Sequence, residues 1–134
     1  MIAPTTMNNQ RLRELIRQKA STIHEDELGF WKFEFDEMLV LVITDESHNR
    51  MRIISPVLEL DSMPDEQWKV LMSANFDRAL DARYCVNGDM LWSAFIHPLE
   101  QLTSGQFLNG LQQVVTLAKN YGTSYSSGEV VFNG

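Results

Sequence analysis

Apolar residues near the start of the chain recur at intervals of three and four, which is the spacing of one face of a helix. The pattern predicts an amphipathic helix over residues 8–22, whose apolar face includes Leu12 and Ile16. Asn8 or Asn9 can accept a hydrogen bond from the first exposed backbone N–H groups and so cap this helix. An acidic connector over residues 25–28 follows.

The period then changes to two, which is the signature of β-strands. Residues 31–35 alternate large apolar with charged side chains, and this predicts a half-buried strand. The unbroken apolar run of residues 38–44 is typical of a strand covered on both faces. Residues 50–57 alternate again after a polar turn. Three successive strands joined by short turns predict an antiparallel meander.

A second helix is predicted after the meander. Ser62, Pro64 and Asp65 form a helix start, because proline tolerates the first turn and an acid there meets the positive end of the helix dipole. The helix should run to about Arg78. Asn75 interrupts its apolar stripe, and a structural hydrogen-bonding role is expected for it. The stripe consists of Trp68, Leu71, Met72, Asn75 and Phe76.

A hairpin follows, with arms over residues 82–86 and 89–96. Asn87-Gly88 between them predicts a type I′ turn, since both central residues of such a turn need positive φ. Both faces of the second arm carry apolar groups. One face holds Met90, Trp92, Ala94 and Ile96, and the other holds Leu91, Ser93, Phe95 and His97.

A last helix is predicted over residues 104–121. Thr103 and Gln106 have the spacing of a capping box at its start, and Gly122 ends it. The predicted order is therefore αβββαββα, an α+β fold in which an antiparallel sheet packs against helices.

Length and composition favour one domain over residues 1–134, with loose ends at 1–9 and 122–134. A chain of 134 residues with 44% hydrophobic residues can bury a core without disulfides or metals. The Ser-, Gly- and Tyr-rich segment 121–128 is expected to be flexible or to dock, and residues 130–132 are a candidate extra strand.

Charge and cysteine content narrow the class of partner. The net charge of -7 opposes binding to nucleic acid, although Arg11, Arg13, Arg17 and Lys19 form a local basic group. This group is expected to be a solvated helix surface, with the guidance of an acidic partner as the alternative. No membrane span or secretory signal is visible, and the single cysteine, Cys85, agrees with a reducing compartment; a cytoplasmic location is expected.

The sequence contains no recognisable catalytic, cofactor-binding or metal-binding motif. His24, His48 and His97 lack the spacing of helical metal ligands, and no Gly-rich phosphate loop or Cys-x-x-Cys pair occurs. Cys85 and His97 would form a dyad only if strand geometry placed them together. No catalytic residue, metal or cofactor is therefore predicted, and the chain is not expected to be an enzyme.

Large side chains on the hairpin and the middle helix are the candidate functional residues. Two faces of apolar groups on one hairpin exceed what a simple exposed strand carries, which suggests an interface between two copies or with a peptide. An ordinary core position for all of them is the competing interpretation. The candidate interface residues are Trp68, Tyr84, Leu91, Trp92 and Phe95.

The predicted order of elements resembles the type III secretion chaperone-like fold, including its YbjN-like relatives. The likeness is carried by Leu71-Met72-x-x-Asn75, Ala82-Arg83-Tyr84, Gly88-Asp89, residues 99–102 and Phe107-Leu108-x-Gly110-Leu111. It is that of a bacterial branch and not of a secretion chaperone proper, with a cyanobacterial source as one candidate. The resemblance implies a homodimer that binds or stabilises a polypeptide, and no enzymatic activity. The basic first helix departs from an effector-binding chaperone.

Three functional hypotheses follow. The first is a dimeric adaptor or chaperone-like module of unknown partner, with the hairpin at 82–97 and the middle helix as its surface. The second is a small enzyme or ligand sensor with a pocket between the sheet and its helices. The third is a subunit that is stable only within a larger complex.

Overall fold

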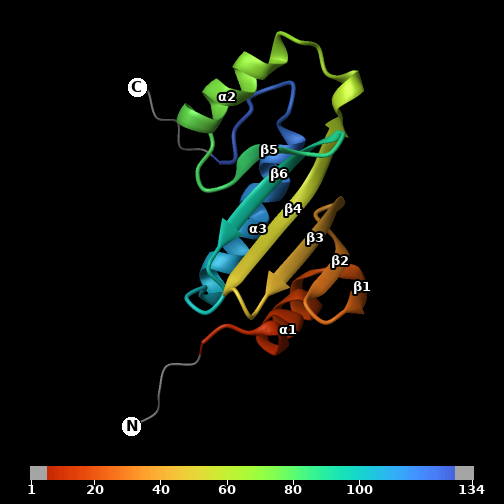
Figure 1. The fold of residues 1–134 in the computed structure, drawn as a ribbon, viewed down its shortest axis with the longest axis vertical. Coiled ribbons are helices and arrows are strands. Elements are labelled where there is room, and N and C mark those ends of the chain that lie inside the picture. The colour runs from red at the N-terminus through yellow and green to blue at the C-terminus, as the bar shows by residue number, and fades with distance from the viewer. Residues whose placement is uncertain (1–5, 129–134) are drawn as a thin grey trace.

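The core element is a six-stranded antiparallel sheet, seen in a computed structural model that describes residues 6–128 (Figure 1). Its strand order is β1-β2-β3-β4-β6-β5, so the last hairpin joins the sheet through its second arm, β6. The strands are β1 (Ser21–Glu27), β2 (Phe30–Phe35), β3 (Met38–Asp45), β4 (Arg50–Glu59), β5 (Arg83–Asn87) and β6 (Met90–His97).

Two helices, α1 (Asn9–Lys19) and α3 (Ser104–Lys119), bury their apolar faces in the same core. In Figure 1, α3 lies behind β4 and β6, and no helix stands in front of these strands. The third helix, α2 (Gln67–Asp77), follows a short 3-10 turn at Leu60–Ser62 and contacts the edge strand β5. Within the described residues, the sheet therefore has one covered face and one face without a helix.

Strand register explains which side chains enter the core. Trp31, Val42, Ile53 and Phe95 are neighbours across β2, β3, β4 and β6, and all four are buried. Adjacent residues point to opposite faces of a strand. The flanking positions on each strand therefore point to the face without a helix.

The long helix α3 lies unusually close to the sheet at Gly110. A Cβ atom at this position would come within 2.8 Å of ring carbons of Phe95, so glycine is required by the packing. Two hydroxyls fasten the same layers: Ser93 Oγ donates to the carbonyl of Val114 at 2.8 Å, and Tyr84 Oη donates to that of Leu117 at 2.9 Å.

Both expected helix caps that the sequence motifs specify are present. Asn8 Oδ1 accepts a hydrogen bond from the backbone N–H of Arg11. Thr103 and Gln106 form the predicted capping box of α3, in which each side chain accepts from the other's backbone N–H. The α+β class and the antiparallel sheet packed on helices are confirmed.

The predicted order αβββαββα misses one strand. Residues 21–27, expected to be the end of the first helix and a connector, form β1, so four strands precede α2. The helix stops at Lys19, and Thr22 has a positive φ of 53°. A strand of mainly exposed polar residues has no apolar alternation, and its pairing with β2 includes two register shifts. The periodicity of apolar residues in the sequence therefore does not reveal this strand.

Two local predictions also need correction. The middle helix begins at Gln67, after the predicted start, and its cap residue Glu66 makes no side-chain capping bond. In the hairpin, Asn87 pairs with Met90, so the two-residue turn is Gly88-Asp89. Positive φ occurs in this turn at Gly88 alone, which is the pattern of a type II′ turn and excludes type I′.

Some of the described residues in both predicted loose ends are packed, although Thr6 and residues 122–124 are exposed. Met7 is buried and donates its backbone N–H to Glu100. Ser126 and Ser127 are also buried, and the Ser127 hydroxyl accepts from the backbone N–H of Leu80 at 2.5 Å. The segment thus docks beside α2. The candidate strand at residues 130–132 lies outside the described residues.

Candidate protein-interaction site

The predicted interface residues separate into two groups in the structure. Tyr84, Leu91 and Phe95 are buried in the core of one protomer, on the face covered by α3. The prediction that they form an accessible interface needs correction, because the helix shields their side of the hairpin. Trp92 is half-buried on the opposite face, and Trp68 is exposed on α2.

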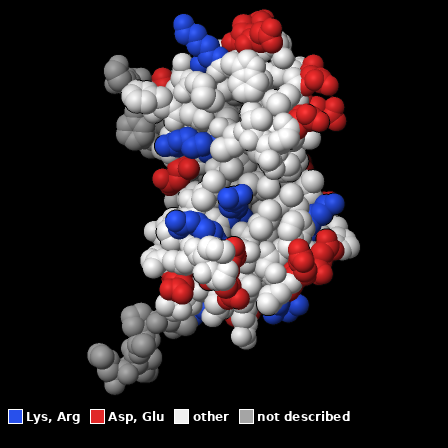
Figure 2. Space-filling model, viewed as in Figure 1, with Lys and Arg blue, Asp and Glu red and all other residues white. Residues whose placement is uncertain are grey.

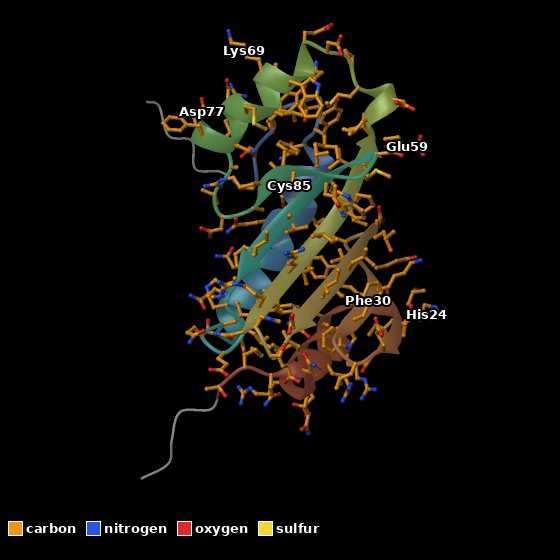
Figure 3. The ribbon with its side chains drawn as sticks, in the orientation of Figure 1. His24, Phe30, Glu59, Lys69, Asp77 and Cys85 are labelled. Atoms are coloured by element: carbon orange, nitrogen blue, oxygen red, sulfur yellow. The ribbon has the colours of Figure 1, made fainter. Side chains whose placement is uncertain are left out.

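The face without a helix carries apolar side chains where solvent-facing strands normally carry polar ones. The prediction that residues 38–44 are covered on both faces is wrong: Val40 and Val42 are buried, whereas Leu39 is exposed and Leu41 is only half-buried. On β6, Ile96 is also exposed. In Figure 3 this face extends between Phe30 on β2 and Cys85 on β5. Its half-buried apolar members are Phe30, Leu41, Ile43, Ile54, Pro56, Met90 and Trp92.

A second apolar surface lies on α2. Trp68, Met72 and Phe76 follow one another at intervals of four, and are 39%, 54% and 78% exposed. The helix instead buries Leu71 and Ala74. The sequence assigned all apolar positions to one inner face, so it missed Met72 and Phe76 as surface residues. Their spacing alone contained the signal of a separate stripe.

An ion pair neutralises one member of the basic group that was predicted on the first helix. Arg13 forms a bidentate ion pair with Glu25, with its nearer contact at 2.6 Å, and Trp31 Nε1 donates to the same carboxylate at 2.9 Å. Hydrogen bonding from Arg13 lowers the pKa of Glu25. Arg13 therefore ties β1 to α1, whereas Arg17 and Lys19 remain exposed.

The postulated Cys85–His97 dyad is excluded by strand geometry. Cys85 pairs with Trp92 on the face without a helix, whereas His97 shares the parity of Phe95 and stacks on its ring. Burial also raises the pKa of Cys85, which disfavours the thiolate. Within residues 6–128, no cluster of three or more His, Cys, Asp or Glu side chains has a geometry that could hold a metal ion.

One polar cavity does lie between the sheet and a helix. It has a volume of about 330 Å³ and opens where β5 begins, between β6 and the first half of α3. Its polar lining includes Asp81, Arg83, His97, Gln106 and Asn109. His97 Nδ1 lies 2.8 Å from the carbonyl of Pro98, so this nitrogen is engaged within the loop.

Comparisons with known proteins identify the fold. No protein-family model matches the sequence, and no curated protein is significantly similar to it. A chain in the crystal structure of the ExsC–ExsE complex is 18% identical, with a TM-score of 0.64 over 84% of this chain and 92% of that one. A chain in the structure of the HopA1–SchA chaperone–effector complex is 10% identical, with a TM-score of 0.62 over 81% and 87%. The predicted chaperone-like fold is confirmed.

None of the helices within residues 6–128 combines the length and the hydropathy that a bilayer crossing requires.

Proposed function

We propose that this protein is a chaperone-like module that binds another polypeptide, acts as a homodimer in the cytoplasm and has no catalytic role. The observation that carries the proposal is the exposed apolar stripe of α2, which no other part of residues 6–128 covers. The fold shared with a chain of a chaperone–effector complex supports the same class of function. Assignment to the YbjN-like branch remains a prediction from the short motifs between Val70 and Tyr121.

The stripe suits a two-fold interface. Trp68, Met72 and Phe76 run along one side of α2, so a second copy rotated by two-fold symmetry brings the same three side chains against them in antiparallel order. Exposed Val86, at the end of the neighbouring strand β5, extends the apolar surface. Burying such side chains is worth about 1.5–3 kcal/mol each, which favours association.

Light scattering with matched variants tests the dimer. The wild-type protein should show twice the chain mass of 15.4 kDa. Phe76→Asp should give the mass of one chain with an unchanged circular dichroism spectrum, because the side chain is 78% exposed and folding does not depend on it. Val70→Asp, which adds the same charge on the side of α2 opposite the stripe, should remain dimeric. A monomeric wild-type protein would remove the dimer from the proposal.

Capture of partners tests the polypeptide-binding role separately. The tagged protein should recover the same polypeptide in repeated captures from its source cells, and cross-links to that polypeptide should fall on the sheet face without a helix, because the second copy occupies the α2 stripe. Recovery of no polypeptide, or cross-links confined to α1, would contradict the proposal.

A small-ligand sensor or enzyme is the second candidate, and the cavity between β6 and α3 is the observation that favours it. Its volume of about 330 Å³ lies at the lower end of the range of ligand sites. Native mass spectrometry of the purified protein would support this candidate if a bound small molecule were lost on changing Asn109 to Leu. A spectrum of the unmodified chain mass alone favours the polypeptide-binding role.

A further inference from the structure

We infer that the sheet face opposite α1 and α3 binds a segment of a partner polypeptide that combines acidic with apolar side chains. This inference rests on the proposed polypeptide-binding function and adds the site and the chemistry of the partner. We call the outward-pointing residues of β2, β3, β4, β6 and β5 the open face.

Two rows of side chains form the centre of the open face. Strand register fixes them: one row is Phe30, Ile43, Arg52 and Ile96, and the other is Lys32, Leu41, Ile54, Ala94 and Arg83. Across these strands the two rows hold the cations Lys32 and Arg52 and no acid, and Arg83 lies at the edge strand, where its guanidinium donates to the carbonyls of Leu80 and Ala82. The rest of their members are apolar. An occupant therefore meets apolar surface interrupted only by positive charge.

The concentration of positive charge is significant because the chain as a whole carries a net charge of -7. Lys32 and Arg52 are exposed, and neither forms an ion pair within residues 6–128. Figure 2 shows this side of the molecule: Lys and Arg side chains stand on a largely uncharged surface, and acidic side chains lie mostly toward its margins. Charge complementarity thus favours an acidic occupant over a basic one.

The margins of the open face set the limits of the site. By register, Asp45 pairs with Arg50 at one end, Glu59 pairs with Met90 at the other, and Glu34 lies on the β2 side. A hollow of about 540 Å³ lies at the Asp45 end. It is lined by Asn9, Leu28, Ile43, Thr44, Asp45, Glu46, Arg50 and Arg52. Because acids line part of this hollow, the acidic groups of the occupant are expected over the central rows.

Trp92 supplies a second observation on the same face. Its indole N–H is inaccessible to solvent and has no acceptor within the described residues. A buried donor without an acceptor costs about 1–3 kcal/mol, so native proteins seldom retain one without a reason. Because this N–H is shielded from solvent, an occupant would remove the cost only if the indole turned outward and met an acceptor oxygen of the occupant. A second copy of the chain fits this face less well, because the positively charged side chains of the two copies would then face each other.

Peptide binding measured by fluorescence anisotropy tests the inference. The probe is a labelled synthetic peptide that places leucines and glutamates on opposite faces. Its controls replace every glutamate by lysine, or every leucine by serine. The dimeric wild-type protein should bind the Leu/Glu peptide at least tenfold more tightly than either control. Added salt should weaken this binding, because the charges involved are exposed.

Variants locate the site. Arg52→Glu and Ile96→Ser should each weaken binding of the Leu/Glu peptide by roughly tenfold, since one reverses a central charge and the other removes apolar contact. Arg17→Glu makes the same charge change on α1 and should leave affinity within about twofold, because α1 packs on the covered side of the sheet and Arg17 is not part of the open face. Unfolding midpoints should match the wild-type value in all three variants.

Equal binding of the Leu/Glu and Leu/Lys peptides, or wild-type affinity in both Arg52→Glu and Ile96→Ser, would overturn the inference. So would a change of light-scattering mass in these two variants, which would assign the face to a second copy. The proposed function fails independently, through the Phe76→Asp mass and the capture experiment. Binding that survives Phe76→Asp would place the peptide on a site separate from the α2 stripe.

Discussion

The side-chain amide of Asn75 pairs with the backbone of Tyr84 as a neighbouring strand would. Its Nδ2 donates to the Tyr84 carbonyl at 3.0 Å, and its Oδ1 accepts from the Tyr84 N–H at 2.8 Å. The structural role expected for Asn75 is confirmed. This contact satisfies the outer edge of β5, which would otherwise offer a free donor and acceptor to another strand.

Changing Asn75 to Ala should destabilise the protein by about 1–3 kcal/mol, because both backbone groups of Tyr84 lose their partner. Urea unfolding measures the loss. Ser73→Ala is the control on the same helix, since Ser73 is exposed. Equal stability of the two variants would show that water replaces the amide at no cost.

Replacing two glycines of α3 by alanine should change the stability of the protein in opposite directions. At Gly110 the added Cβ would clash with Phe95, and the overpacking should cost about 1–3 kcal/mol. At Gly105 the nearest atom is Thr103 Oγ1 at 4.0 Å, so alanine should stabilise the helix by up to about 1 kcal/mol. Thermal unfolding of the two variants compares them directly. A shift of the same sign in both would contradict the close approach of α3 to the sheet.

Substitution by aspartate should affect folding differently on the two faces of β6. Phe95→Asp places a charge in the core and should cost more than about 3 kcal/mol, which predicts an unfolded or insoluble protein. Trp92→Asp changes a half-buried residue of the open face and should leave a folded protein with weaker peptide binding. Circular dichroism at low temperature distinguishes these outcomes. A folded Phe95→Asp protein would argue against the assigned register.

Burial of Tyr84 should make the protein sensitive to alkali. Burial is the main cause that raises the pKa of this phenol, which ionises near pH 10 in an unfolded chain. Its contribution to stability is therefore complete below pH 10 and declines as the pH rises further, by up to about 1.4 kcal/mol per pH unit.

Tyr84→Phe removes this dependence. The variant loses the hydrogen bond to Leu117, which should cost about 1 kcal/mol at neutral pH, but its stability should decline less steeply above pH 10. Urea unfolding at several pH values gives both quantities. Parallel curves for the variant and the wild-type protein would contradict a buried phenol. Light-scattering mass should not change, because Tyr84 is not exposed.

The sequence predicted the elements whose signal is local. The capping box of Thr103 and Gln106 specifies a helix start by itself, and alternation along residues 31–35 specifies a strand. The strand at residues 21–27 was missed because its stabilisation comes from backbone pairing with β2, to which mostly exposed polar side chains contribute no pattern.

The candidate site was harder to predict, because the sequence shows that a side chain is apolar but not which part of the protein or of a partner covers it. The run at residues 38–44 has the same composition whether a helix or a partner lies on its second face. For Leu91 and Phe95, cover depends on the position of α3, which is set by the distant contact of Gly110 with Phe95. Among the predicted interface residues, Trp68 and Trp92 therefore stay proposals, and Met72 and Phe76 join them.

Because α1 and α3 lie on one side of the sheet, alternate positions of each strand have different roles. One set packs in the core, and the other set points to the open face. On β4, polar replacements of Met51 and Ile53 should abolish folding, whereas those of Arg52 and Ile54 should be tolerated by the fold. A new binding preference can thus arise from substitutions at every second residue while the core sequence stays constant. The same strand therefore carries one set of residues that determines folding and another that determines binding, and substitutions in the second set have little effect on the first.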